Sequence, residues 1–180
     1  MIDKLIHEFT NLYGENSNEI KKFFSPSRIN IIGEHIDYNG GKVFPCAIEI
    51  GTYGIARKND QGLINLASMN MDLRGQISLK DLNYKEENNW MNYPVGVIKF
   101  LEEEGHKIGG LDILIYGNIP NGSGLSSSSS LELLIGEIVN VFYNEGQIDK
   151  LDLVKIGKRT ENEFIGVNSG IMDQFIIGLG

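Results

Sequence analysis

A run of small residues between Pro120 and Leu131 has the composition of a phosphate-binding loop. Every residue from Asn121 to Ser130 is asparagine, glycine or serine except Leu125, and an apolar helical pattern follows. Glycine lets a backbone approach a ligand closely, and a helix N-terminus offers unpaired N–H groups and partial positive charge. Serine hydroxyls can donate to phosphate or bind Mg²⁺. The run predicts a phosphate cradle; the alternative is a flexible linker, which need not precede a long apolar helix.

A second group of polar side chains lies between Ser25 and Gly41. Arg28, Glu34, His35 and Asp37 surround a short apolar strand and a Gly-Gly turn. Hydroxyl groups of a polyol are held by side chains that accept and donate hydrogen bonds. This concentration of an arginine, a histidine and two carboxylates therefore predicts a polyol-binding site.

Three segments of the chain resemble motifs of one kinase family. Residues 27–38, Ser-Arg-Ile-Asn-Ile-Ile-Gly-Glu-His-Ile-Asp-Tyr, resemble the galactokinase signature Gly-Arg-x-Asn-x-Ile-Gly-Glu-His-x-Asp-Tyr. The serine-rich run resembles the phosphate loop of the GHMP kinases, the superfamily that includes the galactokinases. Residues 169–175, Ser-Gly-Ile-Met-Asp-Gln-Phe, resemble the segment that carries the family's catalytic aspartate. The three motifs stand in the family's order at compatible spacings.

The resemblance implies an α+β fold, the GHMP-kinase N-terminal domain, also called ribosomal protein S5 domain 2-like. This fold has a mixed or antiparallel sheet with packed helices. The resemblance covers nearly all of residues 1–180, yet it implies a chain about twice this long. We therefore expect residues 1–180 to form an N-terminal galactokinase-like domain, with the C-terminal GHMP domain absent from this chain.

The resemblance also implies catalytic and metal-binding residues. Asp173 would face the anomeric hydroxyl of a sugar and accept its proton, and Arg28 would be its electrostatic partner. Arginine suits that role because its guanidinium is planar and permanently charged. Ser128 and Glu161 would bind Mg²⁺, which prefers hard oxygen ligands. For Glu161, the spacing of twelve residues to Asp173 is the only argument.

Ligand-binding residues follow in the same way. The sugar would be held by Glu34, His35, Ile36 and Asp37 together with Asp173; His35 could equally be a structural histidine. ATP would be bound by Ser68, a weak match, and by loop residues Gly122, Ser123, Gly124, Leu125, Ser126, Ser127 and Ser128.

The chain departs from the family pattern at four positions. Ser27 stands where glycine is usual, Ile36 where threonine is frequent, Ser129 where alanine is common and Ser169 where cysteine is frequent. None of the four is a proposed catalytic group. Ser27 matters most, because a glycine there can serve the backbone geometry beside Arg28, and we expect the serine to be tolerated.

The activity that the resemblance implies is ATP-dependent phosphorylation of galactose at the C1 hydroxyl, giving galactose 1-phosphate in the Leloir pathway. We expect the 180-residue chain by itself to be inactive. One alternative is a non-catalytic galactose-sensing homologue. Another is a GHMP kinase for a different sugar, such as N-acetylgalactosamine or arabinose, or for mevalonate or homoserine. The Glu-His-Ile-Asp-Tyr segment argues against the non-sugar substrates.

Composition and charge narrow the range of possible partners and the cellular compartment of the protein. The net charge of −8 argues against nucleic acid or an anionic membrane as the main partner, since both require clustered Lys and Arg. The apolar runs are far shorter than a membrane span, and the N-terminus lacks the pattern of a signal peptide. Cys46, the one cysteine, lies among apolar residues and is expected to be a buried thiol. We expect a cytoplasmic monomer.

Hydrophobic periodicity indicates the elements that must position these residues. We expect one or two helices over residues 3–23 and strands at 24–32, 43–50, 52–57, 63–67 and 76–79. A helix at 92–104 and a strand at 111–116 should follow. After the serine-rich loop, the pattern predicts helices at about 128–143 and 151–164 and the start of another over 171–177. The loop would thus lead directly into a long apolar helix.

Overall fold

A mixed β-sheet forms the centre of the molecule in the computed structural model, which describes residues 1–33, 36–120 and 124–180. Within these residues the strands are β1 (Lys21–Ile32), β2 (Phe44–Lys58), β3 (Leu63–Ser68), β4 (Gly75–Ser78) and β5 (Leu111–Gly117). Their order across the sheet is β1-β2-β5-β3-β4. Only β3 and β5 pair in parallel; the other neighbours are antiparallel.

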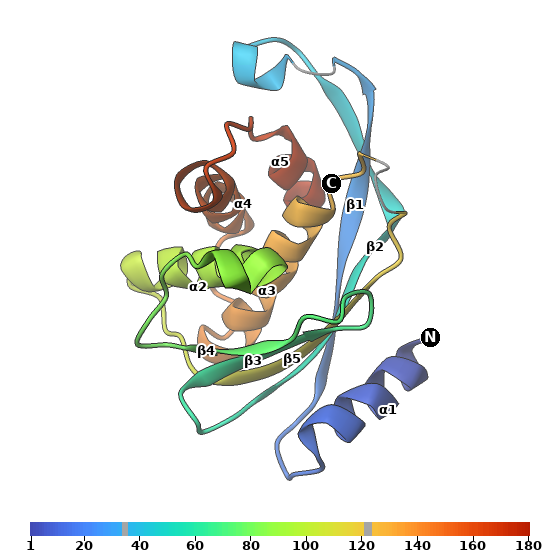
Figure 1. The fold of residues 1–180 in the computed structure, drawn as a ribbon. Helices are drawn as coiled ribbons and strands as arrows, with labels where there is room; N and C mark the ends of the chain where they lie inside the picture. Colours follow the sequence, from blue (N-terminus) through green and yellow to red (C-terminus); the bar gives the residue numbers. More distant parts are fainter. Residues whose placement is uncertain (34–35, 121–123) are drawn as a thin grey trace.

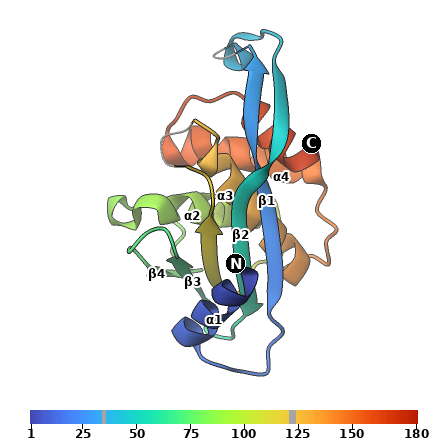
Figure 2. The ribbon, with the colours of Figure 1, turned by 90° about the vertical axis from the view of Figure 1, so that its right-hand side faces the viewer.

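Helices cover both faces of this sheet (Figures 1 and 2). One face packs against α2 (Asn92–Glu103), α3 (Ser127–Tyr143), α4 (Lys150–Arg159) and α5 (Met172–Leu179), and the other against α1 (Ile2–Tyr13). Shorter turns are η1 (Asp37–Asn39), η2 (Glu86–Met91) and the π-helical η3 (Thr160–Ile165). None of the helices in the described ranges is both long and apolar enough to pass through a membrane.

Alternation along the central strands divides the core into two parts. Ile113 and Ile115 of β5 pack against the helical layer of α2–α5, whereas Leu114 between them packs against α1. Successive side chains of a strand point to opposite faces, so a strand buried on both faces is apolar throughout. The larger core therefore lies on the side of α3, whose N-terminus follows the serine-rich loop.

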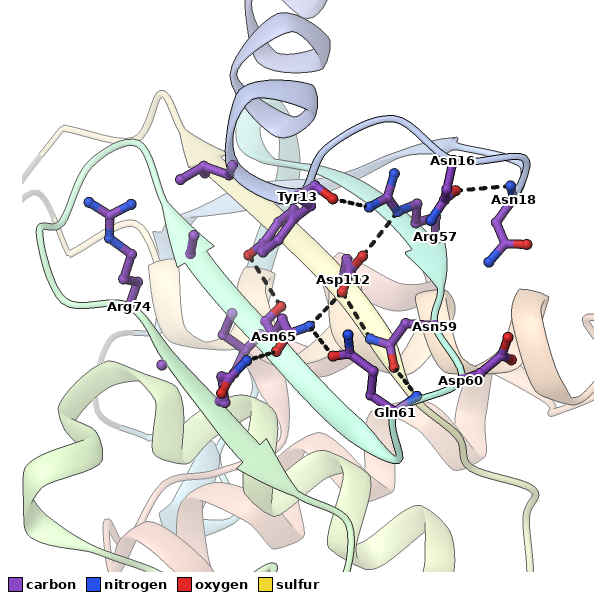
Figure 3. Close-up of a pocket in the computed structure, with 15 residues that line it drawn as sticks. Tyr13, Asn16, Asn18, Arg57, Asn59, Asp60, Gln61, Asn65, Arg74 and Asp112 are labelled. Carbon is purple, nitrogen blue, oxygen red and sulfur yellow. Dashed lines mark hydrogen bonds and ion pairs between the residues drawn. The ribbon is translucent and has the colours of Figure 1, made fainter.

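A buried polar network fixes the C-terminal end of α1 to the other face. Arg57 pairs with Asp112 at 3.0 Å and donates to the carbonyl oxygens of Tyr13 and Gly14 at 2.6 and 2.7 Å. Tyr13, Arg57 and Asp112 line a cavity of about 750 Å³. Asn65 also donates to Asp112 there (Figure 3). Because the polar groups around Asp112 bond one another, this network serves to anchor α1.

Several expectations for the elements are corrected by the structure. Residues 3–23, predicted to form one or two helices, form one helix that ends at Tyr13, where Gly14 (φ 70°) turns the chain out of it. Phe23 lies in β1. The two strands predicted at 43–50 and 52–57 are one strand, β2. The helix predicted to 164 changes to a π-helical turn at Thr160. The remaining elements lie where their periodicity placed them, within a few residues.

The expectation that Cys46 is buried was wrong. Its side chain is exposed, as are those of Ile31, Ile32 and Phe44 nearby. These residues lie where β1 and β2 pair at the end toward η1, and Figure 1 shows this hairpin extending past the helical layer. An apolar sequence context therefore did not imply burial here.

Candidate active site

An ion pair between Arg28 and Asp173 joins β1 to the first turn of α5. Arg28 Nε donates to Asp173 Oδ1 at 2.8 Å, and Nη2 donates to Oδ2 at 2.7 Å. The Arg28 side chain is 9% exposed and that of Asp173 is 26% exposed. The pairing of β1 with β2 shifts register between Pro26 and Ser27, and this irregularity accompanies the burial of both Ser27 and Arg28. A bidentate pair of this kind fixes the carboxylate in orientation as well as position.

The end of the serine-rich loop is tied to the same pair. Arg28 Nη1 donates to the carbonyl oxygen of Gly124 at 2.6 Å, and the Ser126 hydroxyl donates to Asp173 Oδ2. Gly124 and Ser126 both have left-handed backbone conformations, with φ of 65° and 56°. For a serine this conformation is uncommon and is characteristic of functional loops. The loop thus reaches the first turn of α3 directly beside Asp173.

Two side-chain oxygens that could bind a metal ion meet at the start of α3. The Ser128 hydroxyl donates to Glu161 Oε1 at 2.9 Å, and Glu161 is 7% exposed on the π-helical turn η3. The side chains fit the coordination preferences of Mg²⁺, which binds one or two protein oxygens together with phosphates and waters. The N–H groups of a helix's first turn have no intrahelical partner, so α3 can also receive phosphate oxygens.

A cavity of about 220 Å³ lies next to these serines. Its lining includes Ser68, Trp90 and Tyr93, and it ends at Ser127 and Ser128. Aromatic and apolar walls with few polar groups are typical of sites for flat organic ligands. Ser68, expected from the sequence to lie near a nucleotide, is one of the residues that line this cavity.

Asp37 of η1 lies against the segment that leads into α5. A side chain at Gly170 would collide with it, since a Cβ built there would lie 1.8 Å from Asp37 Oδ2. The Gly170 backbone therefore contacts the Asp37 carboxylate, three residues before Asp173. Ile36 is partly exposed, and its side chain packs against Gly41 instead. Glu34, His35, Gly122 and Ser123 lie outside the described residues.

The structure also reveals residues that sequence reasoning assigned no role. The Ser27 hydroxyl donates to the carbonyl oxygen of Leu125 in the loop, and the Ser169 hydroxyl donates to Glu161 Oε2 at 2.5 Å. Trp90 and Tyr93 line the cavity of about 220 Å³ beside the serines. Ser27 and Ser169 are both positions where the chain departs from the family pattern, and this departure could have drawn attention to their hydroxyls. Nothing in the spacing of Trp90 distinguished it from a core residue.

Two family models match the chain. The one described as "GHMP kinases N terminal domain" matches residues 92–180, and the "Galactokinase galactose-binding signature" matches residues 7–58. Together they include Arg28, Asp37, Ser128, Glu161 and Asp173.

Similar proteins and solved structures agree with the family models. A galactokinase of Clostridium tetani is 54% identical over 99% of the chain, and one of Streptococcus thermophilus is 58% identical over 98%. The crystal structure of Lactococcus lactis galactokinase complexed with galactose superposes with a TM-score of 0.93 at 44% identity over 99% of the chain. A mevalonate kinase of Methanococcus jannaschii shares the fold, with a TM-score of 0.75 at 24% identity over 91% of the chain and 52% of its own length.

The chain spans just under half the length of these galactokinases: 45% for Clostridium tetani and 46% for both Streptococcus thermophilus and Lactococcus lactis. Its matched part is the N-terminal region, with the signature, the phosphate loop and the aspartate segment in order. The chain therefore belongs to the galactokinase family of the GHMP kinases.

Proposed function

We propose that the full-length protein containing this chain transfers the γ-phosphoryl group of ATP to the C1 hydroxyl of galactose. The observation that carries the proposal is the bidentate Arg28–Asp173 pair beside the N-terminus of α3. It brings an acceptor for the hydroxyl proton next to a phosphate-binding helix end. Phosphoryl transfer requires mainly such positioning and charge stabilisation.

Asp173 is the proposed acceptor of the sugar's C1 proton. Its oxygens receive three hydrogen bonds, two from Arg28 and one from Ser126. A carboxylate has about four lone-pair sites, so one remains for the sugar hydroxyl. Arg28 supplies a fixed positive charge beside the oxygen that becomes negative as the proton leaves.

Ser128 and Glu161 are the proposed protein ligands of Mg²⁺. When bound, the cation would offset the negative charge on the phosphate oxygens. The Ser127–Ser130 turn of α3 would receive those oxygens, and the cavity at Trp90 and Tyr93 would hold the base.

Asp37 is the proposed ligand of the sugar's C3 and C4 hydroxyls. It contacts Gly170, which lies three residues before Asp173. An acceptor set for the axial C4 hydroxyl of galactose is left without that partner when glucose enters. Such a loss discriminates by about 10²–10⁵ in kcat/KM. Glu34 and His35 are proposed to complete the pocket. We further propose a cytoplasmic monomer that needs neither nucleic acid nor a membrane.

The test is ADP release by the full-length protein across galactose, glucose, N-acetylgalactosamine, arabinose and mevalonate. Methyl galactoside, whose C1 oxygen carries no proton, is the matched control. We expect turnover with galactose, none with the methyl galactoside, and at least about a hundredfold lower kcat/KM with glucose. Equal kcat/KM for galactose and glucose would remove galactose from the proposal, and galactose binding without turnover would favour a sensor.

A further inference from the structure

Behind the site, two fully buried polar side chains face each other. Glu132 of α3 is 1% exposed and Gln174 of α5 is 0% exposed. Gln174 Nε2 donates to Glu132 Oε2 at 3.1 Å. Glu132 lies one helical turn after Ser128, and Gln174 directly follows Asp173. The pair therefore connects the helix of the phosphate loop to the helix of the proposed proton acceptor.

Each side chain of this pair has one oxygen that lacks a hydrogen-bond partner within the part of the chain that the structure describes. Among the described residues, Glu132 Oε1 and Gln174 Oε1 are both buried oxygens with no donor. Two oxygens cannot satisfy each other, and a buried acceptor without a donor costs free energy. A proton on Glu132 Oε1 would supply the missing hydrogen. The acid and the amide would then each donate once and accept once.

The surroundings of Glu132 favour the neutral acid. Gly157 of α4 leaves the space for the pair, because a Cβ there would lie 3.0 Å from Gln174 Cγ and 3.4 Å from Glu132 Oε2. Burial raises the pKa of Glu132 well above its ordinary value, and the charges of Glu161 and Asp173 raise it further.

No cation among the described residues is shown to offset this effect. The Tyr93 hydroxyl of α2 lies within electrostatic range of Glu132, and its own pKa is raised, mainly by burial. The guanidinium of Arg28 on β1 is paired with Asp173. The faces that α2, α4, α5 and η3 turn toward Glu132 thus carry negative or neutral groups.

We propose that Glu132 is a neutral carboxylic acid in the folded protein and forms a reciprocal hydrogen-bonded pair with Gln174 that positions Asp173. Glu132 and Gln174 are positioning residues in this account, because neither touches a substrate. The pair holds the first turn of α5 against α3, so Asp173 stays aligned with Arg28 and with the loop. The pairing stands independently of the proposed function; only its effect on turnover rests on it.

Linkage between protonation and folding gives the first test. A carboxyl whose pKa is raised by folding contributes stability that is present below its unfolded pKa and lost as pH rises through the folded pKa. Between the pKa of Glu132 in the unfolded state and its pKa in the folded state, the unfolding constant of the wild type should rise up to about tenfold per pH unit relative to Glu132→Gln. An amide keeps one donor and one acceptor, so the variant keeps the pairing without the titration.

The experiment measures urea unfolding of the full-length protein and of Glu132→Gln from acidic to alkaline pH, with infrared spectra of both at neutral pH. Glu137→Gln, which removes a carboxylate from the same helix at a more accessible position, is the matched control. We expect a protonated-carboxyl band that Glu132→Gln alone removes. Parallel stability curves for wild type and Glu132→Gln, or no such band, would overturn the proposal whether or not the protein is a kinase.

Turnover tests the positioning role. Gln174→Leu leaves Glu132 without its partner and should lower kcat at least about tenfold with a smaller change in KM. Glu132→Gln should keep kcat within about threefold, which is rescue by the variant that preserves the pairing. A Glu132→Gln variant as impaired as Gln174→Leu would show that the charge of Glu132 is needed, and would overturn the neutral pair.

Discussion

At the scale of single residues, serine hydroxyls hold the acidic groups of the site. Ser126 donates to Asp173, while Ser128 and Ser169 donate to the two oxygens of Glu161. Each hydroxyl fixes a carboxylate that would otherwise have several rotamers, and each adds no charge of its own. The position of Glu161 is therefore set by side chains from α3 and from the segment before α5.

The proposed metal site makes a prediction about Mg²⁺. Ser128→Ala and Glu161→Gln each remove one hard oxygen ligand or its charge, so both should raise the Mg²⁺ concentration for half-maximal rate. Titration of the full-length enzyme with Mg²⁺ at saturating ATP and sugar measures it. An unchanged Mg²⁺ dependence in both variants would assign the cation to other residues.

Ser169 permits a finer test of the same site. Ser169→Ala removes the hydroxyl that holds Glu161 Oε2 at 2.5 Å, and we expect a several-fold higher Mg²⁺ requirement with galactose KM unchanged. Ser169→Cys, the residue frequent in the family, is the matched control and should lie between alanine and wild type. If alanine behaves as wild type, the hydroxyl does not orient Glu161.

At the scale of elements, the network on the α1 face has a measurable role. Asp112 is 5% exposed, and Asp112→Ala would leave Arg57 buried without its anionic partner. Loss of one member of a buried ion pair costs about 3–5 kcal/mol of unfolding free energy. Urea unfolding checks this, with Asp60→Ala, an exposed carboxylate of the same cavity, as control. Equal stability of both variants would contradict an anchoring role.

Local pattern predicted the elements well and their junctions poorly. The apolar face of α3 and the glycines and serines before it follow from periodicity and composition, so the helix and loop could be placed from sequence. The π-helical turn at Thr160 could not, because one extra residue in a turn leaves no clear periodic signal. The same holds for the register shift at Ser27, which depends on pairing with a distant strand.

The site was predictable to the extent that motifs carried it. Residues that separate motifs singled out lie together in the structure: Arg28 pairs with Asp173, and Ser128 donates to Glu161. The Glu132–Gln174 pair was not predictable, since a glutamate within an amphipathic helix ordinarily faces water. Its burial results from three helices packing together at Gly157.

At the scale of the whole molecule, the chain matches only the N-terminal region of its relatives. Water is excluded from a kinase site when both ligands are covered, and exclusion strengthens the electrostatic interactions inside. We therefore expect residues 1–180 alone to show little or no galactose phosphorylation in a coupled ADP assay. Addition of the missing region, in one chain, should restore it. Turnover by the 180-residue chain close to that of the full-length enzyme would contradict this expectation.

The proposed proton acceptor in phosphoryl transfer is Asp173, held by Arg28, and Asp173→Asn in the full-length protein tests this role most directly. The amide keeps the shape of the side chain and loses the proton acceptor. Turnover with galactose and ATP should fall by at least about 10²-fold. Galactose affinity, measured by calorimetry, should stay within about tenfold, equivalent to about 1.4 kcal/mol. A fall in turnover of less than about tenfold would contradict the claim.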